Sequence, residues 1–164
     1  MMEKAYFAGG CFWCITPTFR EMEGVYRVTS GYSGGDEVDP SYEDVKHQRT
    51  GHRETICVEF DPGKVSFESL LQIFLYSVDP FDDGGQFIDR GFSYTLAVYY
   101  LDESQKAITG KLLGQMEREA GKKPCIAVEP FKNFYTAEEY HQNYDLKNPE
   151  AFRRELVESG RISE

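Results

Sequence analysis

The sequence contains no long hydrophobic run and no excess of positive charge. Lys and Arg total 18 against 28 Asp and Glu, which gives a formal net charge of −10. Nucleic acid and anionic membranes attract basic surfaces, so neither is an expected partner. No segment approaches the ~18 consecutive apolar residues of a membrane-spanning helix, and the first residues lack the basic and apolar regions of a secretion signal. We therefore expect a soluble, cytoplasmic protein.

Histidine is also scarce. The three histidines, His47, His52 and His141, are scattered, and there is a single Cys-x-x-Cys pair. A zinc site needs four nitrogen or sulfur ligands, so we expect no metal and interpret His52 and His141 as hydrogen-bonding scaffold residues. Without a secretion signal, the four cysteines are more typical of catalysis than of a structural disulfide framework.

Aromatic residues, in contrast, are plentiful. The chain has 12 Phe and 11 Tyr, which is enough for a core and for an aromatic pocket. Its length of 164 residues suits one domain spanning residues 1–164. Residues 145–164 are expected to form a peripheral C-terminal helix or tail.

Hydrophobic periodicity and turn residues divide the chain into short strands and helices. The predicted strands are Ala5–Ala8, Val25–Tyr32, Arg53–Asp61, Tyr94–Leu101 and Cys125–Phe131. The predicted helices are Phe12–Met22, Ser66–Val78 and Glu103–Ala120, and the polar stretches Asp36–Gly51 and Asp79–Gly91 are predicted loops. Mixed order and short connections indicate an α+β fold, a two-layer sandwich with a mixed, largely antiparallel central sheet flanked by helices.

The first candidate reactive group is Cys11. Gly9 and Gly10 allow a tight turn between the first strand and the first helix, so Cys11 is expected at a helix N-terminus. The helix dipole and free backbone N–H groups there favour thiolate over thiol. Cys14 completes the Cys-x-x-Cys pair, whose spacing allows one sulfur to turn a sulfenic acid on the other into a disulfide.

A carboxylate also heads an apolar strand face. Arg53–Asp61 alternates, which places Glu54 on the same face as Ile56 and Val58. Burial there would raise the pKa of Glu54, so that it keeps its proton near neutral pH. The alternative is a solvated salt bridge between Glu54 and Arg53 or His52.

Three motifs resemble, in order and spacing, the signature of A-type peptide methionine sulfoxide reductases. They are Gly10-Cys11-Phe12-Trp13, Gly31-Tyr32-Ser33-Gly34-Gly35 and Gly51-His52-Arg53-Glu54. The similarity continues through Asp89-Arg90-Gly91 with Tyr94 and through Phe134-Tyr135-Thr136-Ala137-Glu138 with His141-Gln142, so it covers nearly the whole chain.

The resemblance implies a role for each matching residue. Cys11 attacks the sulfoxide sulfur and becomes a sulfenic acid, while Glu54 protonates the oxygen. Tyr32 and Tyr94 bind that oxygen, which becomes more basic during the attack. Phe12 and Trp13 form the pocket for the substrate methyl group. Asp89 helps to position the site or the substrate backbone.

The family also implies reduction of methionine sulfoxide, free or in peptides, with preference for the S epimer, since one enzyme serves each epimer. No bound cofactor is implied. The enzyme is re-reduced by thioredoxin or a similar dithiol donor.

The sequence departs from the family in its recycling cysteines. The family more often has Gly at the position of Cys14 and a recycling cysteine in the C-terminal tail, whereas no cysteine follows Leu146. A disulfide relay must therefore use Cys14, Cys57 or Cys125, or else an external thiol, and Cys14 is favoured. Residues three apart on a helix have Cβ atoms ~5–6 Å apart, whereas a disulfide needs ~3.5–4.5 Å, so bridging requires some distortion of the first turn.

Further departures concern the substrate loop. Phe87-Ile88 precedes Asp89 where the family often has Gly-Asn, and Ser93 and Thr95 flank Tyr94 where Gln and Arg are more usual. These differences leave substrate preference open without removing a residue that takes part in the sulfur chemistry.

Two other functions remain as alternatives. A thioredoxin-like disulfide oxidoreductase would share the Cys11 and Cys14 pair but needs a parallel βαβ context. A non-enzymatic module would use Phe12 and Trp13 to bind methionine-containing segments without turnover.

The individual residues also have structural interpretations. Phe12, Trp13, Tyr32 and Tyr94 would then be packing residues, and Cys14 a helix residue behind the site. Cys57 and Cys125 are interpreted as buried small hydrophobic residues.

Overall fold

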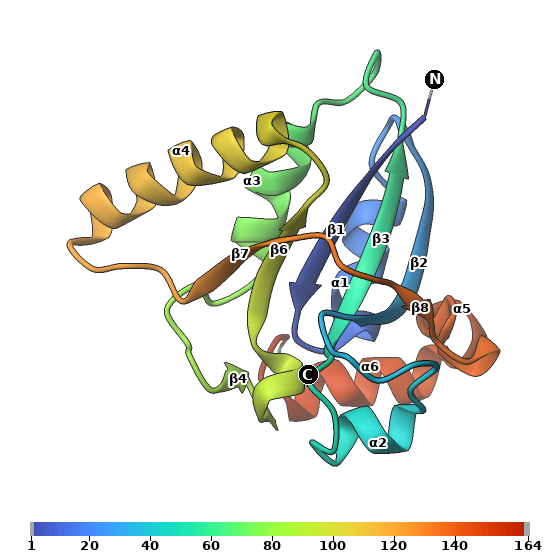
Figure 1. Cartoon of the computed structure of the whole chain (residues 1–164). Coiled ribbons are helices and arrows are strands. Elements are labelled where there is room, and N and C mark those ends of the chain that lie inside the picture. The colour runs from blue at the N-terminus through green and yellow to red at the C-terminus, as the bar shows by residue number, and fades with distance from the viewer. Residues whose placement is uncertain (1, 163–164) are drawn as a thin grey trace.

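A computed structural model describes residues 2–162 (Figure 1). The strands are β1 (Glu3–Gly9), β2 (Val25–Ser33), β3 (Arg53–Phe60), β4 (Gly85–Gln86), β5 (Asp89–Arg90), β6 (Leu96–Tyr100), β7 (Ile126–Pro130) and β8 (Tyr135–Thr136). The α-helices are α1 (Phe12–Arg20), α2 (Tyr42–Lys46), α3 (Phe67–Ser77), α4 (Glu103–Ala120), α5 (Tyr144–Lys147) and α6 (Pro149–Glu158). Short 3-10 turns occupy Phe92–Tyr94 and Glu139–His141. Within the described residues, every helix is too short or too polar to span a bilayer.

Six strands form the main sheet in the order β7-β6-β1-β3-β2-β8. Every neighbouring pair is antiparallel except β6 and β7, which are parallel. The α+β class with a mixed, largely antiparallel sheet is therefore confirmed. Strands β4 and β5 form a separate small hairpin.

Local signals explain most of the helix boundaries. The side chain of Ser66 caps α3 by accepting from Ser69 N–H at 3.0 Å, as its sequence position predicts. Gly121 ends α4 in the left-handed conformation, with φ of 73°. Helix α1 ends at Arg20, two residues before the predicted end at Met22.

Three element predictions were wrong. The predicted loop Asp79–Gly91 contains the two short strands β4 and β5. The predicted loop Asp36–Gly51 contains α2, whose N-cap Ser41 accepts from Asp44 N–H at 3.2 Å. A five-residue helix in a polar segment has too few apolar positions to produce a periodic signal. Tyr94 belongs to a 3-10 turn before β6 rather than to the strand itself.

The alternation of β3 divides the core between the two sheet faces. Ile56, Val58 and Phe60 are fully buried on the face that packs against α1 and α3. Cys57 belongs to a smaller cluster on the other face, together with Tyr6 and Tyr99. This second face is covered by the segment after β7, which crosses in front of the sheet in Figure 1.

Strand register brings the chemically interesting residues to one end of the sheet. In the pairing of β1 with β6, Gly9 at the end of β1 is opposite Leu96 at the start of β6. In the pairing of β2 with β3, Tyr32 near the end of β2 is opposite Glu54 near the start of β3. The turn that follows β1 therefore lies beside the start of β6 and the start of β3.

Candidate active site

Cys11 is the N-cap residue of α1 and only 6% exposed. Its carbonyl oxygen accepts from the backbone N–H of Cys14 at 3.1 Å, so both cysteines belong to the first turn. Gly10 precedes it with φ of 85°, a conformation that favours glycine. A Cβ atom at Gly10 would also lie 2.8 Å from Cβ of Gln86, so the space beside Cys11 admits no side chain there.

Glu54 is the buried carboxyl group of the site, at 1% exposure. The backbone N–H of Phe12 donates to its Oε1 at 3.2 Å, and no cation pairs with it among residues 2–162. Burial raises the pKa of Glu54 to about 8; Asp89 and Cys14 add to this rise, and the Phe12 N–H and the Tyr94 hydroxyl oppose it. Glu54 therefore holds a proton at neutral pH. The alternative of a solvated salt bridge is wrong, because the side chain is buried.

The pKa of Cys11 is raised above its ordinary value. Interaction with the neighbouring Cys14 thiol is the largest cause, followed by burial and by the carboxyl groups of Glu54 and Asp89. The position at the helix N-terminus was predicted correctly, but the expectation that the thiolate is favoured in the resting site was wrong. Helix-end stabilisation is modest, whereas burial among acidic groups disfavours a further negative charge.

Aromatic rings cluster around the first turn of α1, directly after Cys11. The ring of Phe12 is fully buried, 5.2 Å from the ring of His141 and 5.9 Å from that of Tyr32. Trp13 stacks on Tyr144 of α5, with ring centroids 3.9 Å apart and planes 9° from parallel. The two residues predicted to form the methyl pocket thus belong to one aromatic cluster beside the nucleophile.

His141 orients Trp13. The indole Nε1–H donates to Nδ1 of His141 at 3.0 Å, which requires the tautomer with its proton on Nε2. Burial lowers the pKa of His141 to about 4, so the ring is neutral and able to accept at neutral pH. The predicted scaffold role of His141 is therefore confirmed.

The predicted tyrosines occupy different positions in the site. Tyr32 is fully buried, and its hydroxyl donates to Oε1 of Glu138 at 2.8 Å. The other carboxylate oxygen of Glu138 accepts from the backbone N–H of Tyr42 at 2.9 Å. Tyr32 therefore positions the start of α2 through Glu138. Its hydroxyl proton is used in the hydrogen bond to that carboxylate.

Tyr42 is a site residue that sequence reasoning missed. Burial and the nearby charges of Glu54 and Cys11 raise its pKa. Burial, Glu54 and Tyr42 raise the pKa of Tyr94 in the same way. The phenols of Tyr42 and Tyr94 thus lie near the reacting groups. Ser41-Tyr42-Glu43-Asp44 has the spacing of a helix capping box, a signal that would have identified α2.

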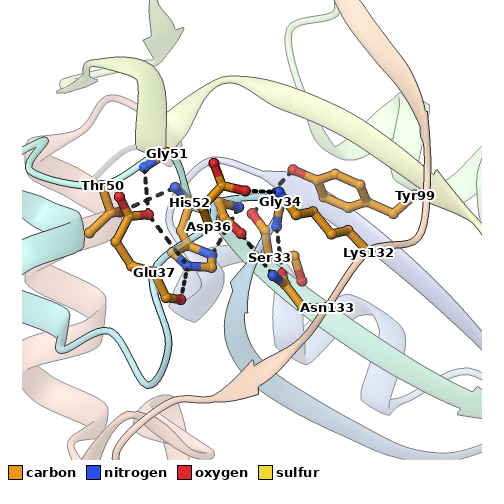
Figure 2. Close-up of polar contacts among 11 residues, drawn as sticks. Ser33, Gly34, Asp36, Glu37, Thr50, Gly51, His52, Tyr99, Lys132 and Asn133 are labelled. Atoms are coloured by element: carbon orange, nitrogen blue, oxygen red, sulfur yellow. Dashed lines mark hydrogen bonds and ion pairs between the residues drawn. The ribbon is translucent and has the colours of Figure 1, made fainter.

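A polar network fixes the loop between β2 and α2 (Figure 2). Gly35 N–H donates to Nδ1 of His52 at 3.2 Å, and Nε2–H of His52 donates to the carbonyl oxygen of Glu37 at 2.8 Å. From the segment after β7, Asn133 accepts from Gly34 N–H at 3.0 Å and donates to Gly35 O at 2.8 Å. This network confirms the scaffold role predicted for His52 and anchors the loop that leads to Tyr42.

Asp89 lies in β5 of the small hairpin, with 19% of its side chain exposed. Burial raises the pKa of Asp89, while Arg161 and Lys46 oppose this rise. Asp89 in turn raises the pKa values of Glu54 and Cys11. It therefore lies within electrostatic reach of the reacting groups.

The remaining cysteines differ in their access to Cys11. Cys14 lies in the same helical turn as Cys11, and its thiol raises the pKa of Cys11. Cys57 is on the opposite sheet face, where the Tyr6 hydroxyl interacts with its thiol. Cys125 precedes β7, which is two strand spacings, ~10 Å, from the end of β1. Cα atoms of disulfide-bonded cysteines are usually no more than ~7 Å apart, so Cys14 is the favoured partner by position.

A buried thiol beside a protonated carboxyl group, with a second thiol in the same helical turn, defines the site of a thiol-dependent oxidoreductase. The profile of one family, described as peptide methionine sulfoxide reductase, matches residues 3–162. Peptide methionine sulfoxide reductase MsrA of Bacillus velezensis is 45% identical over 97% of this chain and 91% of its own length. Peptide methionine sulfoxide reductase MsrA 2 of Staphylococcus aureus is 46% identical over the same shares.

Solved structures agree with the sequence relatives. Mxr1 of Saccharomyces cerevisiae in reduced form superposes with a TM-score of 0.85 at 28% identity, over 91% of this chain and 87% of that one. Methionine sulfoxide reductase A of Corynebacterium diphtheriae gives a TM-score of 0.81 at 27% identity, over 90% of this chain and 76% of that one.

The chain therefore belongs to the peptide methionine sulfoxide reductase family, in its A-type branch. It is an enzyme that reduces methionine sulfoxide to methionine.

Proposed function

We propose that Cys11 is the nucleophile and Glu54 the proton donor of this reduction. Sγ of Cys11 attacks the sulfoxide sulfur, and the carboxyl group of Glu54 gives its proton to the oxygen and regains one from the thiol. The oxygen then passes to Sγ. The substrate S–O bond breaks, methionine leaves in reduced form, and Cys11 is oxidised to the sulfenic acid. The observation that carries this proposal is the raised pKa of Glu54 beside Cys11, since the acid still holds its proton at neutral pH.

The phenols of Tyr42 and Tyr94 stabilise the oxygen during this step. Tyr94 is buried and Tyr42 half-buried near Glu54, and both keep their hydroxyl protons because their pKa values are raised. They are thus hydrogen-bond donors at the place where negative charge develops on oxygen. Tyr32, for which the sequence predicted this role, acts through Glu138 on the position of Tyr42.

Phe12 and Trp13 bind the substrate methyl group, and Asp89 accepts a hydrogen bond from its main chain. The rings of Phe12 and Trp13 both pack near His141, so together they supply an apolar wall for the methyl group. A site with one apolar wall and one proton-donating wall selects one configuration at sulfur. We assign the S epimer from the family resemblance.

Cys14 resolves the sulfenic acid. Its thiol attacks Sγ of Cys11, the hydroxyl group leaves as water, and the resulting disulfide is reduced by a dithiol such as thioredoxin. The interaction between the two thiols supports this assignment. The yeast relative Mxr1, which is 21% identical to this chain in that structure, has been solved in complex with Trx2, and this supports thioredoxin as the donor. A reducing compartment such as the cytoplasm suits this cycle.

The test is methionine formation from a peptide containing methionine S-sulfoxide, with dithiothreitol, with thioredoxin, and without reductant. Cys11→Ser is expected to form no methionine under any condition. Cys14→Ser is expected to form about one methionine per enzyme without reductant and to lose turnover with thioredoxin. Cys125→Ser is the control and keeps turnover.

Three outcomes would contradict the proposal. Turnover by Cys11→Ser would exclude Cys11 as the nucleophile. Undiminished thioredoxin-driven turnover by Cys14→Ser would move the resolving role to another thiol. Equal rates with the R and S sulfoxides would exclude the proposed orientation.

A further inference from the structure

The C-terminal segment brings a cation to the edge of the site. Arg161 follows α6, and its backbone N–H donates to the carbonyl oxygen of Leu156 at 3.0 Å. Its guanidinium carbon lies 4.3 Å from the ring centroid of Phe87, and its Nη2 lies 3.8 Å from Oδ2 of Asp89. Only 12% of the Arg161 side chain is exposed. Residues 145–164, expected to be peripheral, thus contribute a nearly buried charge beside Asp89.

This ion pair leaves hydrogen-bonding capacity unused. A separation of 3.8 Å is too long for a hydrogen bond. Oδ2 of Asp89 and Nη1 of Arg161 are both buried, and neither has a hydrogen-bond partner within residues 2–162. A buried donor or acceptor without a partner is costly, so one unused donor beside one unused acceptor indicates a place for a polar ligand.

The support under Arg161 is itself strained. Phe87 has φ of 54°, a left-handed conformation that is unfavourable for a bulky residue. In this conformation Phe87 remains 42% exposed, with the guanidinium against its ring. Stacking on an aromatic ring stabilises and orients a guanidinium group. Phe87 and Ile88 are positions at which the sequence departs from its family, and Phe87 here supports a residue of the C-terminal segment.

Other charged groups surround the pair. Lys46 of α2 interacts favourably with Asp89, and Glu155 of α6 faces both Asp89 and Arg161. Burial raises the pKa of Glu155, and the charge of Asp89 adds to the rise. Asp89 is the one carboxylate that forms an ion pair with Arg161 among residues 2–162. The guanidinium therefore retains attraction for a second anion.

We propose that Arg161 is the residue of this enzyme that recognises the α-carboxylate of its substrate. Nη1 of Arg161 donates to a carboxylate oxygen, while Oδ2 of Asp89 accepts from the α-nitrogen of the same residue. The preferred substrates are then methionine sulfoxides with a free carboxylate, either the free amino acid or a C-terminal residue. Internal residues, which present a neutral carbonyl group, bind more weakly. This inference rests on the proposed placement of the reacting sulfur at Cys11.

The test compares three S-sulfoxide substrates with dithiothreitol as reductant: free methionine sulfoxide, its N-acetyl derivative, and the N-acetyl N-methylamide. The variant Arg161→Met keeps an apolar chain against Phe87 but removes the charge. Charge-assisted hydrogen bonds contribute enough that KM for the two carboxylate substrates should rise about tenfold or more. The kcat values, and KM for the amide, should remain within about threefold, since the reacting groups are untouched.

Two further variants separate recognition from structure. Arg154→Met removes an exposed arginine of α6 and is expected to leave all three KM values unchanged. Arg161→Lys keeps the charge and is expected to restore most of the discrimination between acid and amide. Thermal unfolding of each variant checks that α6 remains packed.

Each outcome decides the inference. A rise limited to the free amino acid, or to the N-acetyl acid, identifies which carboxylate source is recognised. Equal changes for all three substrates mean that Arg161 only fastens the C-terminal segment, and no change means that it does not contact substrate; either result overturns the inference. If the wild-type enzyme forms no methionine from any of the three, the proposed function itself fails.

Discussion

Strand β3 buries two consecutive charged residues on opposite faces of the sheet. Arg53 has polar partners on its face: Nε donates to Thr95 Oγ1 at 2.9 Å, Nη1 donates to the Tyr99 hydroxyl at 3.0 Å, and Glu129 forms an ion pair at 3.3 Å. Glu54, on the face that packs against α1, accepts one backbone hydrogen bond and has no cationic partner among the described residues.

The difference in partners separates a structural residue, Arg53, from a reactive one, Glu54. Partners compensate the burial of Arg53, so its charge connects β3 to β6 and β7. Glu54 lacks such compensation, and its carboxyl group keeps a proton instead. The same strand therefore stabilises the fold with one side chain and supplies a proton donor with the next.

The largest expected effect is on the chemistry at Glu54. Glu54→Gln keeps the shape of the side chain and an oxygen for Phe12 N–H, but removes the transferable proton. The rate of methionine formation should fall about 10²–10⁴-fold, the usual contribution of general acid catalysis. Single-turnover measurements without reductant report this step separately from recycling. A loss of less than about tenfold would transfer the acid role to another group.

The same substitution should stabilise the protein at alkaline pH. The pKa of Glu54 is about 8 in the folded protein and about 4.5 when unfolded, so the unfolded chain binds fewer protons between these values and stability falls as pH rises through this window. Glu54→Gln removes this loss and should be more stable by about 4 kcal/mol at pH 8, with no difference near pH 4. Denaturant unfolding at the two pH values measures the difference. Equal stability of the wild type and Glu54→Gln at pH 8 would mean that burial does not raise the pKa of Glu54.

Arg53 should show the opposite pattern. Arg53→Met leaves the Tyr99 hydroxyl and Thr95 without their donor and should lower the free energy of unfolding by about 2 kcal/mol. The single-turnover rate of the folded enzyme should change by less than about threefold. A rate loss as large as that of Glu54→Gln would mean that Arg53 also takes part in catalysis, and would contradict the contrast between the two sheet faces.

The smallest expected effect is at Cys57. Cys57→Ala removes a buried thiol on the face of Arg53 and should cost about 1 kcal/mol of stability. Thioredoxin-driven turnover should be unchanged, because the sheet separates Cys57 from Cys11. Impaired recycling would show that a resolving thiol reaches Cys11 from across the sheet.

Sequence reasoning located the parts of this site that depend on regular patterns. Alternation in β3 placed Glu54 on the apolar face, and the two glycines before Cys11 placed it at the start of a helix. Tyr42 was missed because α2 is too short to be periodic. The use of the Tyr32 hydroxyl could not be predicted either, since its partner Glu138 lies 106 residues away in the chain.

The charge state of Cys11 illustrates a further limit. Its place at a helix N-terminus is a local feature, and the sequence predicted it. The Cys14 thiol, which raises its pKa most, is also local, but burial and the carboxyl groups of β3 and β5 add to the rise and depend on the tertiary fold. Arg161 was not anticipated for the same reason, because its contacts with Phe87 and Asp89 join distant segments.

The central claim, that the buried carboxyl group of Glu54 supplies the proton, is tested most directly by the pH dependence of single-turnover methionine formation at subsaturating substrate. Such rates report the pKa values of the free enzyme. Since Glu54 loses its proton with a pKa of about 8, the wild-type rate should be level below that pH and fall above it, and Glu54→Gln should lack this decline. A wild-type rate that continues to rise through pH 8 would mean that thiolate formation at Cys11 controls the reaction, and would contradict the account.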